Sequence, residues 1–278
     1  MSGKPSIWTQ NKVELLKKLY PIETKENLCN TFALPWSSIK DKACALKIKM
    51  SKYTPSANFQ KLLDFQEPRA AMYLGMLLAD GHFSRKDSIT LSLHQRDKDY
   101  LNHYKDYFDF SSLITLVKNR QDYYLIATDH NLVPLIREKF DIQFQKTYNP
   151  PSLSWIREYN PDLYFAMIVG FIDGDGWISH DHRNHHFRIG TRVHRSWLNN
   201  LIEFQNFLYE YFNIFPTKQK RPPHIIEPCY SNMSLYDQDL LIAVKNKIIE
   251  FDLYPYVLQR KWDKIILSHD NQSIQLTS

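Results

Sequence analysis

The sequence predicts an α+β fold in which two similar αββαββα units follow a small all-α domain of three helices. Three observations lead to this prediction. Two apolar runs end in Asp-Gly, YLGMLLADG from Tyr73 and VGFIDGDG from Val169, and the aspartates Asp80 and Asp175 lie 95 residues apart. A similar order of alternating and helical stretches follows each run. A lysine-rich helical segment precedes both units.

The first fifty residues predict three short helices, which together resemble a helix-turn-helix DNA-binding domain (residues 1–50). Apolar residues recur at helical spacing over residues 9–20 and 24–33. A third helix, capped by Ser37 or Ser38, carries lysines away from its apolar side. A helical bundle that does not contact DNA is the alternative. The predicted DNA contacts of this domain are Lys40, Lys42 and Lys47.

The positive charge of the chain is concentrated in this first segment. Residues 1–60 contain ten lysines and four acidic residues, whereas the whole chain carries a net charge of +5 at pH 7. The rest is therefore close to neutral. A basic module on a near-neutral body suggests an anionic partner such as nucleic acid, and a solvated lysine-rich surface is the alternative. Residues 51–66 are expected to form a linker.

The composition indicates a globular protein of a reducing compartment. Hydrophobic residues make up 43% of the chain. The longest apolar run, residues 70–79, is too short to span a bilayer, and no signal peptide is visible. The three cysteines show no paired spacing, so no disulfide framework or cysteine zinc site is expected. We expect no membrane partner and an intracellular location in the cytoplasm or nucleoid, with a phage-infected host or an organelle left open.

The two halves, residues 67–150 and 151–278, are expected to contain the same elements. Each opens with a proline, Pro68 or Pro161, in the first turn of a helix, where its missing N–H costs nothing. The apolar run follows, and then a polar stretch that alternates as a strand does. The first half predicts strands at 88–94, 113–117 and 123–128 and further helices at 100–108 and 132–140. The second half predicts strands at 186–193, near Thr217 and at 225–236, and further helices at 197–211 and 240–251.

The Asp-Gly pairs place a carboxylate where a helix disfavours it. An aspartate in the last turn lies at the negative end of the helix dipole, at a cost of about 0.3–1 kcal/mol, and a bound cation would offset this cost. The following glycine is expected to adopt the positive φ that ends a helix. Asp-Gly is also a common turn pair, so a single copy would indicate only a turn.

Small residues four positions apart predict that the two apolar helices pack against each other. Gly75 with Ala79, and Gly170 with Gly174, give each helix a flat face on which two backbones can approach closely. Face-to-face packing would then make the two motif aspartates neighbours. Two carboxylates that close repel each other, and one takes up a proton unless a cation lies between them.

Oxygen ligands of this kind favour a hard divalent cation, Mg²⁺ or Mn²⁺. We expect Asp80 and Asp175 to hold the ion, together with the backbone of Ala79 and Gly174. Such an ion suits phosphodiester hydrolysis, because it activates water and stabilises the leaving oxygen.

Both segments resemble the LAGLIDADG motif of the homing endonucleases, over about residues 68–263. The second copy matches closely. The first copy has Leu78 where the motif name has its first aspartate, but it keeps Gly75, Asp80 and Gly81. The resemblance implies a monomeric intron-homing endonuclease that makes a double-strand break at a long site in double-stranded DNA. Its halves would be related by a pseudo-two-fold axis, and their strands would form a β-saddle over the major groove.

The resemblance also implies roles for single residues. The two motif aspartates would be the metal-binding catalytic residues, one in each active site. Lys146 and Lys261 match the family's basic residue, which holds the attacking water or the phosphate. A plain loop charge is the alternative for Lys146. Gln95 and Arg192 fall at corresponding points after the first strand pair, where the family keeps polar residues that position water.

Polar side chains on the expected strand faces are suited to reading DNA. Arginine reads guanine in the major groove, and lysine and arginine also bind phosphate. An ordinary solvent-exposed face, the alternative, would carry more acidic residues. The histidine-rich stretch from His180 to His186 is expected to contact DNA rather than to hold a structural metal. The predicted contacts are Arg85, Lys86, Ser88, Thr90, Ser92, His94, Lys118, Arg120, Arg183, Asn184, His186, Arg188, Lys218, Lys220 and Arg221.

Two other functions stay open on the same fold. One is an RNA-binding maturase, whose partner would be its host intron RNA. The other is a DNA-binding regulator that does not cleave, which the helix-turn-helix-like domain makes conceivable. The presence of both motif aspartates favours cleavage.

Overall fold

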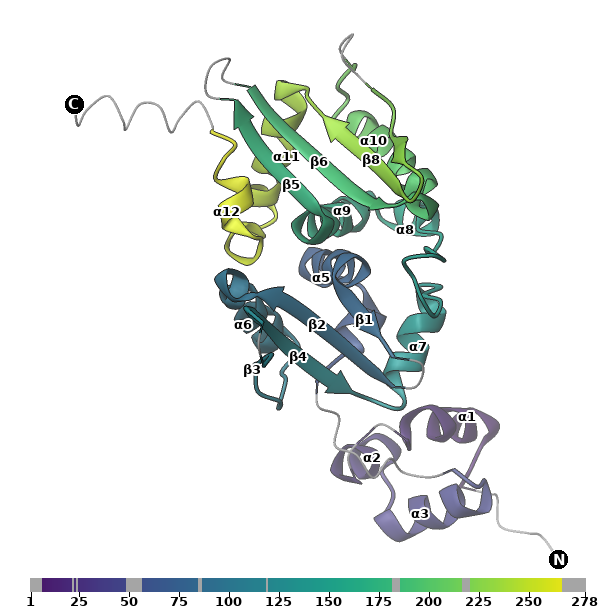
Figure 1. The fold of residues 1–278 in the computed structure, drawn as a ribbon. Coiled ribbons are helices and arrows are strands. Elements are labelled where there is room, and N and C mark those ends of the chain that lie inside the picture. The colour runs from purple at the N-terminus through teal and green to yellow at the C-terminus, as the bar shows by residue number, and fades with distance from the viewer. Residues whose placement is uncertain are drawn as a thin grey trace, which may run out of the picture.

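The protein has the predicted α+β fold, with two four-stranded antiparallel sheets and a group of N-terminal helices (Figure 1). None of the described helices is long and apolar enough to cross a membrane. The computed structural model describes residues 7–21, 23, 25–48, 57–84, 87–118, 120–181, 186–216 and 221–266.

The first half contains the predicted elements in the predicted order. They are α5 (Pro68–Ala79), β1 (Gly81–Phe83), β2 (Ser88–His94), α6 (Lys98–Tyr107), β3 (Thr115–Leu116), β4 (Asp122–Thr128) and α7 (Leu132–Lys139). A short 3₁₀ helix that was not predicted, η1 (Gln95–Asp97), joins β2 to α6. The strands lie in the order β1-β2-β4-β3, and alternate residues of β2 are buried, as its polar–apolar pattern predicts.

The second half repeats this topology, in the strand order β5-β6-β8-β7. Its elements are α8 (Ser154–Tyr159), α9 (Pro161–Asp175), β5 (Gly176–Asp181), β6 (His186–His194), η2 (Arg195–Trp197), α10 (Leu198–Tyr211), β7 (His224–Glu227), β8 (Tyr230–Leu235), α11 (Gln238–Glu250), η3 (Tyr254–Tyr256) and α12 (Gln259–Trp262). The prediction of one strand over 225–236 is wrong, because this stretch forms the β7–β8 hairpin. Pro228, which has no N–H to donate, lies in its turn. The strand expected near Thr217 falls outside the described residues.

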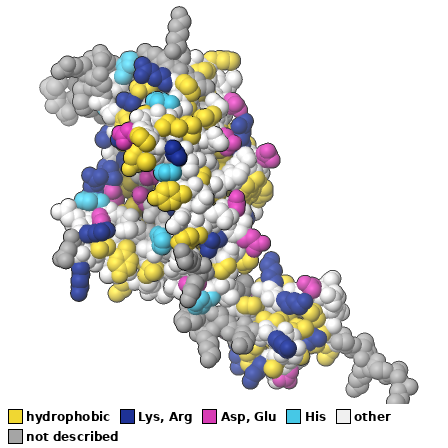
Figure 2. Space-filling view, turned by 45° about the vertical axis from the view of Figure 1, so that its right-hand side comes forward, with side chains coloured by type: hydrophobic (Ala, Val, Ile, Leu, Met, Phe, Trp, Pro, Cys, Tyr) yellow, Lys and Arg dark blue, Asp and Glu magenta, His cyan; other side chains and the backbone are white. Residues whose placement is uncertain are grey.

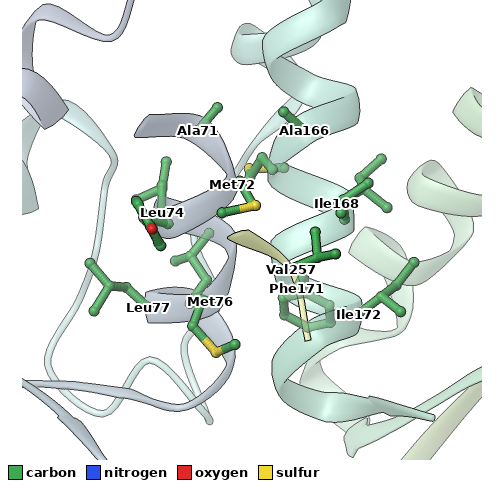
Figure 3. Packing of buried hydrophobic residues seen from close by; sticks show 14 of the residues in the cluster. Ala71, Met72, Leu74, Met76, Leu77, Ala166, Ile168, Phe171, Ile172 and Val257 are labelled. Atoms are coloured by element: carbon green, nitrogen blue, oxygen red, sulfur yellow. The ribbon is translucent and has the colours of Figure 1, made fainter. Parts of the chain in front are cut away.

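The two halves meet along α5 and α9, which make the most extensive contact between any two described elements. Helices α6, α10 and α11 pack behind the sheets, whose other faces point toward the viewer in Figure 1. The sheets lie on either side of the helix pair, which is the predicted saddle arrangement. In the interface, Met72 and Met76 of α5 lie across from Ala166 and Phe171 of α9 (Figure 3).

Two glycines let the backbones of α5 and α9 touch, as their spacing predicted. A Cβ on Gly75 would lie 1.9 Å from Met167 O, and a Cβ on Gly170 would lie 1.8 Å from Met72 O. A side chain at either position would therefore push the helices apart.

The glycines that follow the motif aspartates do not adopt the expected positive φ, which no described glycine shows. Their role is steric instead. A Cβ on Gly81 would lie 2.5 Å from Leu77 O, and a Cβ on Gly176 would lie 2.4 Å from Ile172 O. The chain passes from helix into strand so tightly that a side chain does not fit there.

The N-terminal helices form a small module with its own apolar cluster. They are α1 (Gln10–Leu19), α2 (Lys25–Phe32) and α3 (Trp36–Ala45), which confirms the three predicted helices. The third begins after Pro35 instead of a serine cap. The module lies beside the first half, where Asn131 Nδ2 donates to Pro21 O at 3.0 Å. Lysine side chains lie among hydrophobic ones on its visible surface, at the lower right of Figure 2.

The expected linker at residues 51–66 is wrong from residue 57 onward. Helix α4 (Gln60–Asp64) occupies this stretch, and Phe59, Leu62 and Phe65 are fully buried in the large core. These three residues recur at every third position, which places them on one side of a helical turn. Residues 51–56 lie outside the described part of the chain.

Candidate active site

The α5–α9 contact brings Asp80 and Asp175 to the same end of the interface. Asp80 caps the C-terminus of α5, and Asp175 is the last residue of α9. The helix ends touch, because a Cβ on Gly174 would lie 2.3 Å from Ala79 Cβ and 3.2 Å from Asp80 Oδ2. The helix packing that the glycines predict thus juxtaposes the two carboxylates.

The surroundings of the two carboxylates disfavour their ionisation. Burial raises the pKa of Asp175 to about 6, and the charge of Asp80 adds to this rise. Asp80 is an exposed residue, but partial burial of its carboxyl group also raises its pKa, while Lys261 and Lys146 lower it. A cation bound between two such carboxylates would stabilise their ionised forms.

The two predicted lysines bind the carbonyl groups at the ends of the motif helices. Lys146 Nζ donates to Leu78 O at 2.6 Å and to Ala79 O at 2.8 Å. Lys261 Nζ donates to Asp173 O, and to Gly174 O at 3.2 Å. An ammonium group at this position donates to carbonyls that have no partner within the helix. The negative end of the helix dipole also stabilises its positive charge.

Lys146 is thus anchored and half-buried rather than a free loop charge. Lys261 is almost fully buried. Burial lowers the pKa of both lysines, and nearby carboxylates oppose that effect. For Lys146 the largest opposing charge is Asp175, which belongs to the other half.

Each candidate centre therefore combines groups from both halves. A pocket of about 460 Å³ is lined by Asp175 and Arg192 from the second half and by Ala79 and Lys146 from the first. We call this group the Asp175 centre. The reciprocal group, which we call the Asp80 centre, is Asp80 beside Gly174, with Lys261 bound to the Gly174 carbonyl.

The oxygen atoms of these centres fit Mg²⁺ or Mn²⁺ better than a softer metal. No group of three His, Cys, Asp or Glu side chains that could hold a metal occurs among the described residues. Two carboxylates and the carbonyls of Ala79 and Gly174 are present instead. Mg²⁺ commonly takes one or two carboxylates and completes its shell with water and substrate phosphate. The charge of Asp80 contributes to the raised pKa of Asp175, and a bound cation would relieve this repulsion between the two carboxylates.

The expected correspondence of Gln95 with Arg192 is wrong. Both β2 and β6 end in a histidine, His94 or His194, whose Nδ1 accepts the backbone N–H two residues later, at 3.2 and 3.3 Å. This shared turn aligns Gln95 with Arg195. Arg192 lies two residues before its histidine and lines the Asp175 centre, whereas Gln95 is exposed in η1. The expected correspondence failed because β6 is longer than β2, which shifts the residues that follow the motif in the second half.

Three residues of the site region were missed by the sequence analysis. Asp173 is buried and accepts hydrogen bonds from Trp262 Nε1 at 2.7 Å and Leu258 N at 3.1 Å. Burial raises its pKa to about 7. Asp97 and Arg260 form an ion pair between the halves. Asp173 was visible as the first aspartate of the second motif copy, but no sequence signal pointed to the ion pair.

The free face of the second sheet carries aromatic and basic side chains. The guanidinium carbon of Arg188 lies 4.7 Å from the ring centroid of Trp177 and 4.6 Å from that of Tyr236. Arg192 lies over the ring of Tyr230. On the free face of the first sheet, the following predicted contacts are exposed or half-buried: Ser88, Thr90, Ser92 and His94.

The other predicted DNA contacts divide into two groups. His186, Lys118, Arg120, Arg221, Lys40 and Lys47 are exposed, and Lys42 is half-buried. The remaining ones fall outside the described residues: Arg85, Lys86, Arg183, Asn184, Lys218 and Lys220. Most of the histidine-rich stretch, residues 182–185, falls outside them too.

No protein-family model matches the chain, and a search of curated proteins found no match. Solved structures with a similar arrangement of elements exist at low identity. The LAGLIDADG homing endonuclease I-GzeII, in complex with its DNA target, is 12% identical with a TM-score of 0.48, over 76% of this chain and 93% of that chain. The meganuclease I-SmaMI, bound to uncleavable DNA, is 12% identical with a TM-score of 0.44, over 74% and 92%. The LAGLIDADG homing endonuclease I-LtrWI, bound to target DNA, is 12% identical with a TM-score of 0.42, over 74% and 88%.

Proposed function

We propose that the chain is an endonuclease that hydrolyses one phosphodiester bond in each strand of a long double-stranded DNA site, with Mg²⁺ or Mn²⁺ as cofactor. The observation that carries this proposal is the pair of centres at the ends of α5 and α9. Each contains a carboxylate from one half and a lysine and helix-end carbonyl from the other. A double-strand break requires two such centres, one for each strand. The resemblance of both motif copies to those of homing endonucleases supports the same function.

Within each centre, the chain's own groups would orient the reacting atoms. Asp175 with the Ala79 carbonyl, and Asp80 with the Gly174 carbonyl, would each hold a divalent ion. When bound, Mg²⁺ stabilises the negative charge that develops on the phosphate oxygens. The lysine of each centre would orient the attacking water or a phosphate oxygen by donating a hydrogen bond. Water adds its oxygen to phosphorus, one P–O bond breaks, and a proton passes to the leaving oxygen.

The free faces of the two sheets would bind the DNA. The second sheet offers arginine and histidine for guanine and phosphate, and the first offers hydroxyl groups and histidine. The body of the chain is near neutral, so lysines of the N-terminal module would strengthen attraction to the phosphates.

The proposal is tested by incubating the purified full chain with a duplex DNA library in Mg²⁺ or in EDTA and mapping the cut ends by sequencing. Discrete double-strand breaks that require Mg²⁺, and that Asp80→Asn and Asp175→Asn both abolish, are expected. Asp239→Asn, at an exposed site on α11, is the matched control and should cut normally. Tight binding of DNA or RNA without cutting in any divalent metal would overturn the proposal in favour of a regulator or a maturase.

A further inference from the structure

The segment that carries Lys261 belongs to the second half but is clamped to the first. Arg260 donates to both carboxylate oxygens of Asp97, from Nε at 2.5 Å and from an NH2 group at 2.6 Å. Asp97 is only 7% exposed. Four residues before Arg260, the ring of Tyr256 packs under Arg69 of α5, with its centroid 3.6 Å from the guanidinium carbon. A bidentate pair of this kind fixes orientation as well as distance.

A second clamp fixes the same segment to α9. One oxygen of the Asp173 carboxylate accepts from the Leu258 backbone N–H, and the other accepts from the Trp262 indole. Leu258 and Trp262 lie on either side of Lys261 in the chain. The turn that carries the lysine is therefore held at both ends by one buried side chain, and Lys261 itself is 5% exposed.

The segment that carries Lys146 crosses to the second half in the same way, but with weaker contacts. Ser196 Oγ donates to Thr147 O at 2.7 Å, and the ring of Tyr148 packs against His194 at a centroid distance of 4.8 Å. Tyr148 remains 60% exposed. These contacts involve neutral donors or ring edges, whereas hydrogen bonds to an ionised group are roughly twice as strong.

The difference between the two motif copies explains why the clamp formed by Asp173 has no counterpart at the segment that carries Lys146. Leu78 occupies on α5 the position that Asp173 occupies on α9, two residues before the motif aspartate. Leu78 has no side-chain oxygen that could accept from the Lys146 segment. The first motif copy therefore departs from the second at the residue that fixes the neighbouring lysine.

We propose that Asp173 and the Asp97–Arg260 pair are positioning residues for Lys261, and that the Asp80 centre consequently cuts its DNA strand faster than the Asp175 centre cuts the other. This inference rests on the proposed endonuclease function. Catalytic groups that are already held in the reactive geometry lose less entropy on reaching the transition state. A misplacement of about 1 Å costs about 100-fold in rate. The two strands should therefore be cut in sequence, with a nicked intermediate between them.

The test is a single-turnover assay of the full chain on its target duplex, with the two strands carrying different end labels. Lys261→Met and Lys146→Met identify the strand that each centre cuts. For the wild-type protein we expect the Lys261-dependent strand to be cut first and nicked duplex to accumulate. Arg260→Lys, which keeps the charge but loses the bidentate geometry, and Asp173→Asn should each slow that strand about 10- to 100-fold. The other strand should change less than about twofold, and it serves as an internal control in the same molecule.

A general loss of structure would slow both strands, so the strand-resolved ratio separates positioning from stability. Arg157→Lys, which alters an exposed ion pair with Glu210 away from both centres, is the matched control and should leave both rates unchanged. Cutting of both strands at one rate by the wild-type protein would overturn the inference and leave the endonuclease function standing, as would equal slowing of both strands by Arg260→Lys. Absence of any cutting by the wild-type protein would instead overturn the endonuclease function, and this inference with it.

Discussion

Gly170 of α9 contacts the backbone of Met72 on α5, where a Cβ would lie 1.8 Å from the Met72 carbonyl oxygen. A helix backbone cannot rotate away as a side chain can, so Gly170→Ala must separate the two halves. We expect this substitution to lower the free energy of unfolding by at least about 1–3 kcal/mol, as overpacking of a core does. Urea denaturation followed by circular dichroism measures this loss.

Gly190→Ala provides a graded comparison in the same experiment. A Cβ there would lie 2.3 Å from a ring carbon of Trp177, and a side chain has alternative rotamers. The loss of unfolding free energy should be smaller than for Gly170→Ala. Equal losses in the two variants would contradict the explanation by backbone contact.

The contact between α5 and α9 could be predicted because its signals are local. Apolar runs with glycines four apart indicated two flat helix faces, and the Asp-Gly pairs marked the helix ends. The Asp97–Arg260 pair could not be predicted in this way, because its partners lie 163 residues apart. It depends on how the two halves dock, which periodicity within each half does not encode. The same limitation misaligned Arg192 with Gln95, since only the paired strands reveal that β6 is longer than β2.

The stability of the protein should fall as pH rises from about 4 to about 7. The pKa of Asp175 is raised to about 6 and that of Asp173 to about 7, whereas an aspartate in the unfolded chain titrates near about 3.9. Between these values the folded state binds more protons than the unfolded state, so the free energy of unfolding decreases with pH. The free energy of unfolding, measured by urea denaturation at about pH 4.5, 6 and 7.5, checks this, because these pH values span the titration of both aspartates.

Asp175→Asn separates the contribution of this residue from that of Asp173. The variant has no charge to bury at position 175, so its stability should fall less between pH 4 and pH 6. At neutral pH it should be more stable than the wild-type protein by on the order of 1 kcal/mol, since solvent screens a half-buried group. A pH profile identical to that of the wild-type protein would show that Asp175 titrates normally in the folded chain.

Mg²⁺ should stabilise the folded protein above pH 6, where both motif aspartates can ionise. An ion that binds only the folded state adds about 1.4 kcal/mol at ten times its dissociation constant. We expect Mg²⁺ to raise the melting temperature of the wild-type protein and to raise it much less for Asp80→Asn or Asp175→Asn. An Asp239→Asn control should respond as the wild-type protein does. The same increase in all four proteins would place the ion elsewhere.

Arg188 should determine the preference for one base pair of the target. Its guanidinium lies close to the rings of Trp177 and Tyr236, and one NH2 group donates to Ser234 Oγ at 3.0 Å. An arginine whose plane is fixed can donate two hydrogen bonds to one guanine, and a good pair of this kind contributes about 1–3 kcal/mol of discrimination. Arg188→Lys keeps the charge but loses the planar fork.

The measurement for Arg188 is competition binding to a set of targets in which each base pair is replaced in turn. The wild-type protein should reject replacement of one guanine-containing pair under the second half, and Arg188→Lys should lose that rejection while keeping its preferences elsewhere. Arg157→Lys, outside the free faces of the sheets, should keep the wild-type pattern. If Arg188→Lys instead weakened binding to every target by the same factor, Arg188 would be a phosphate contact, because phosphate contacts carry no sequence information.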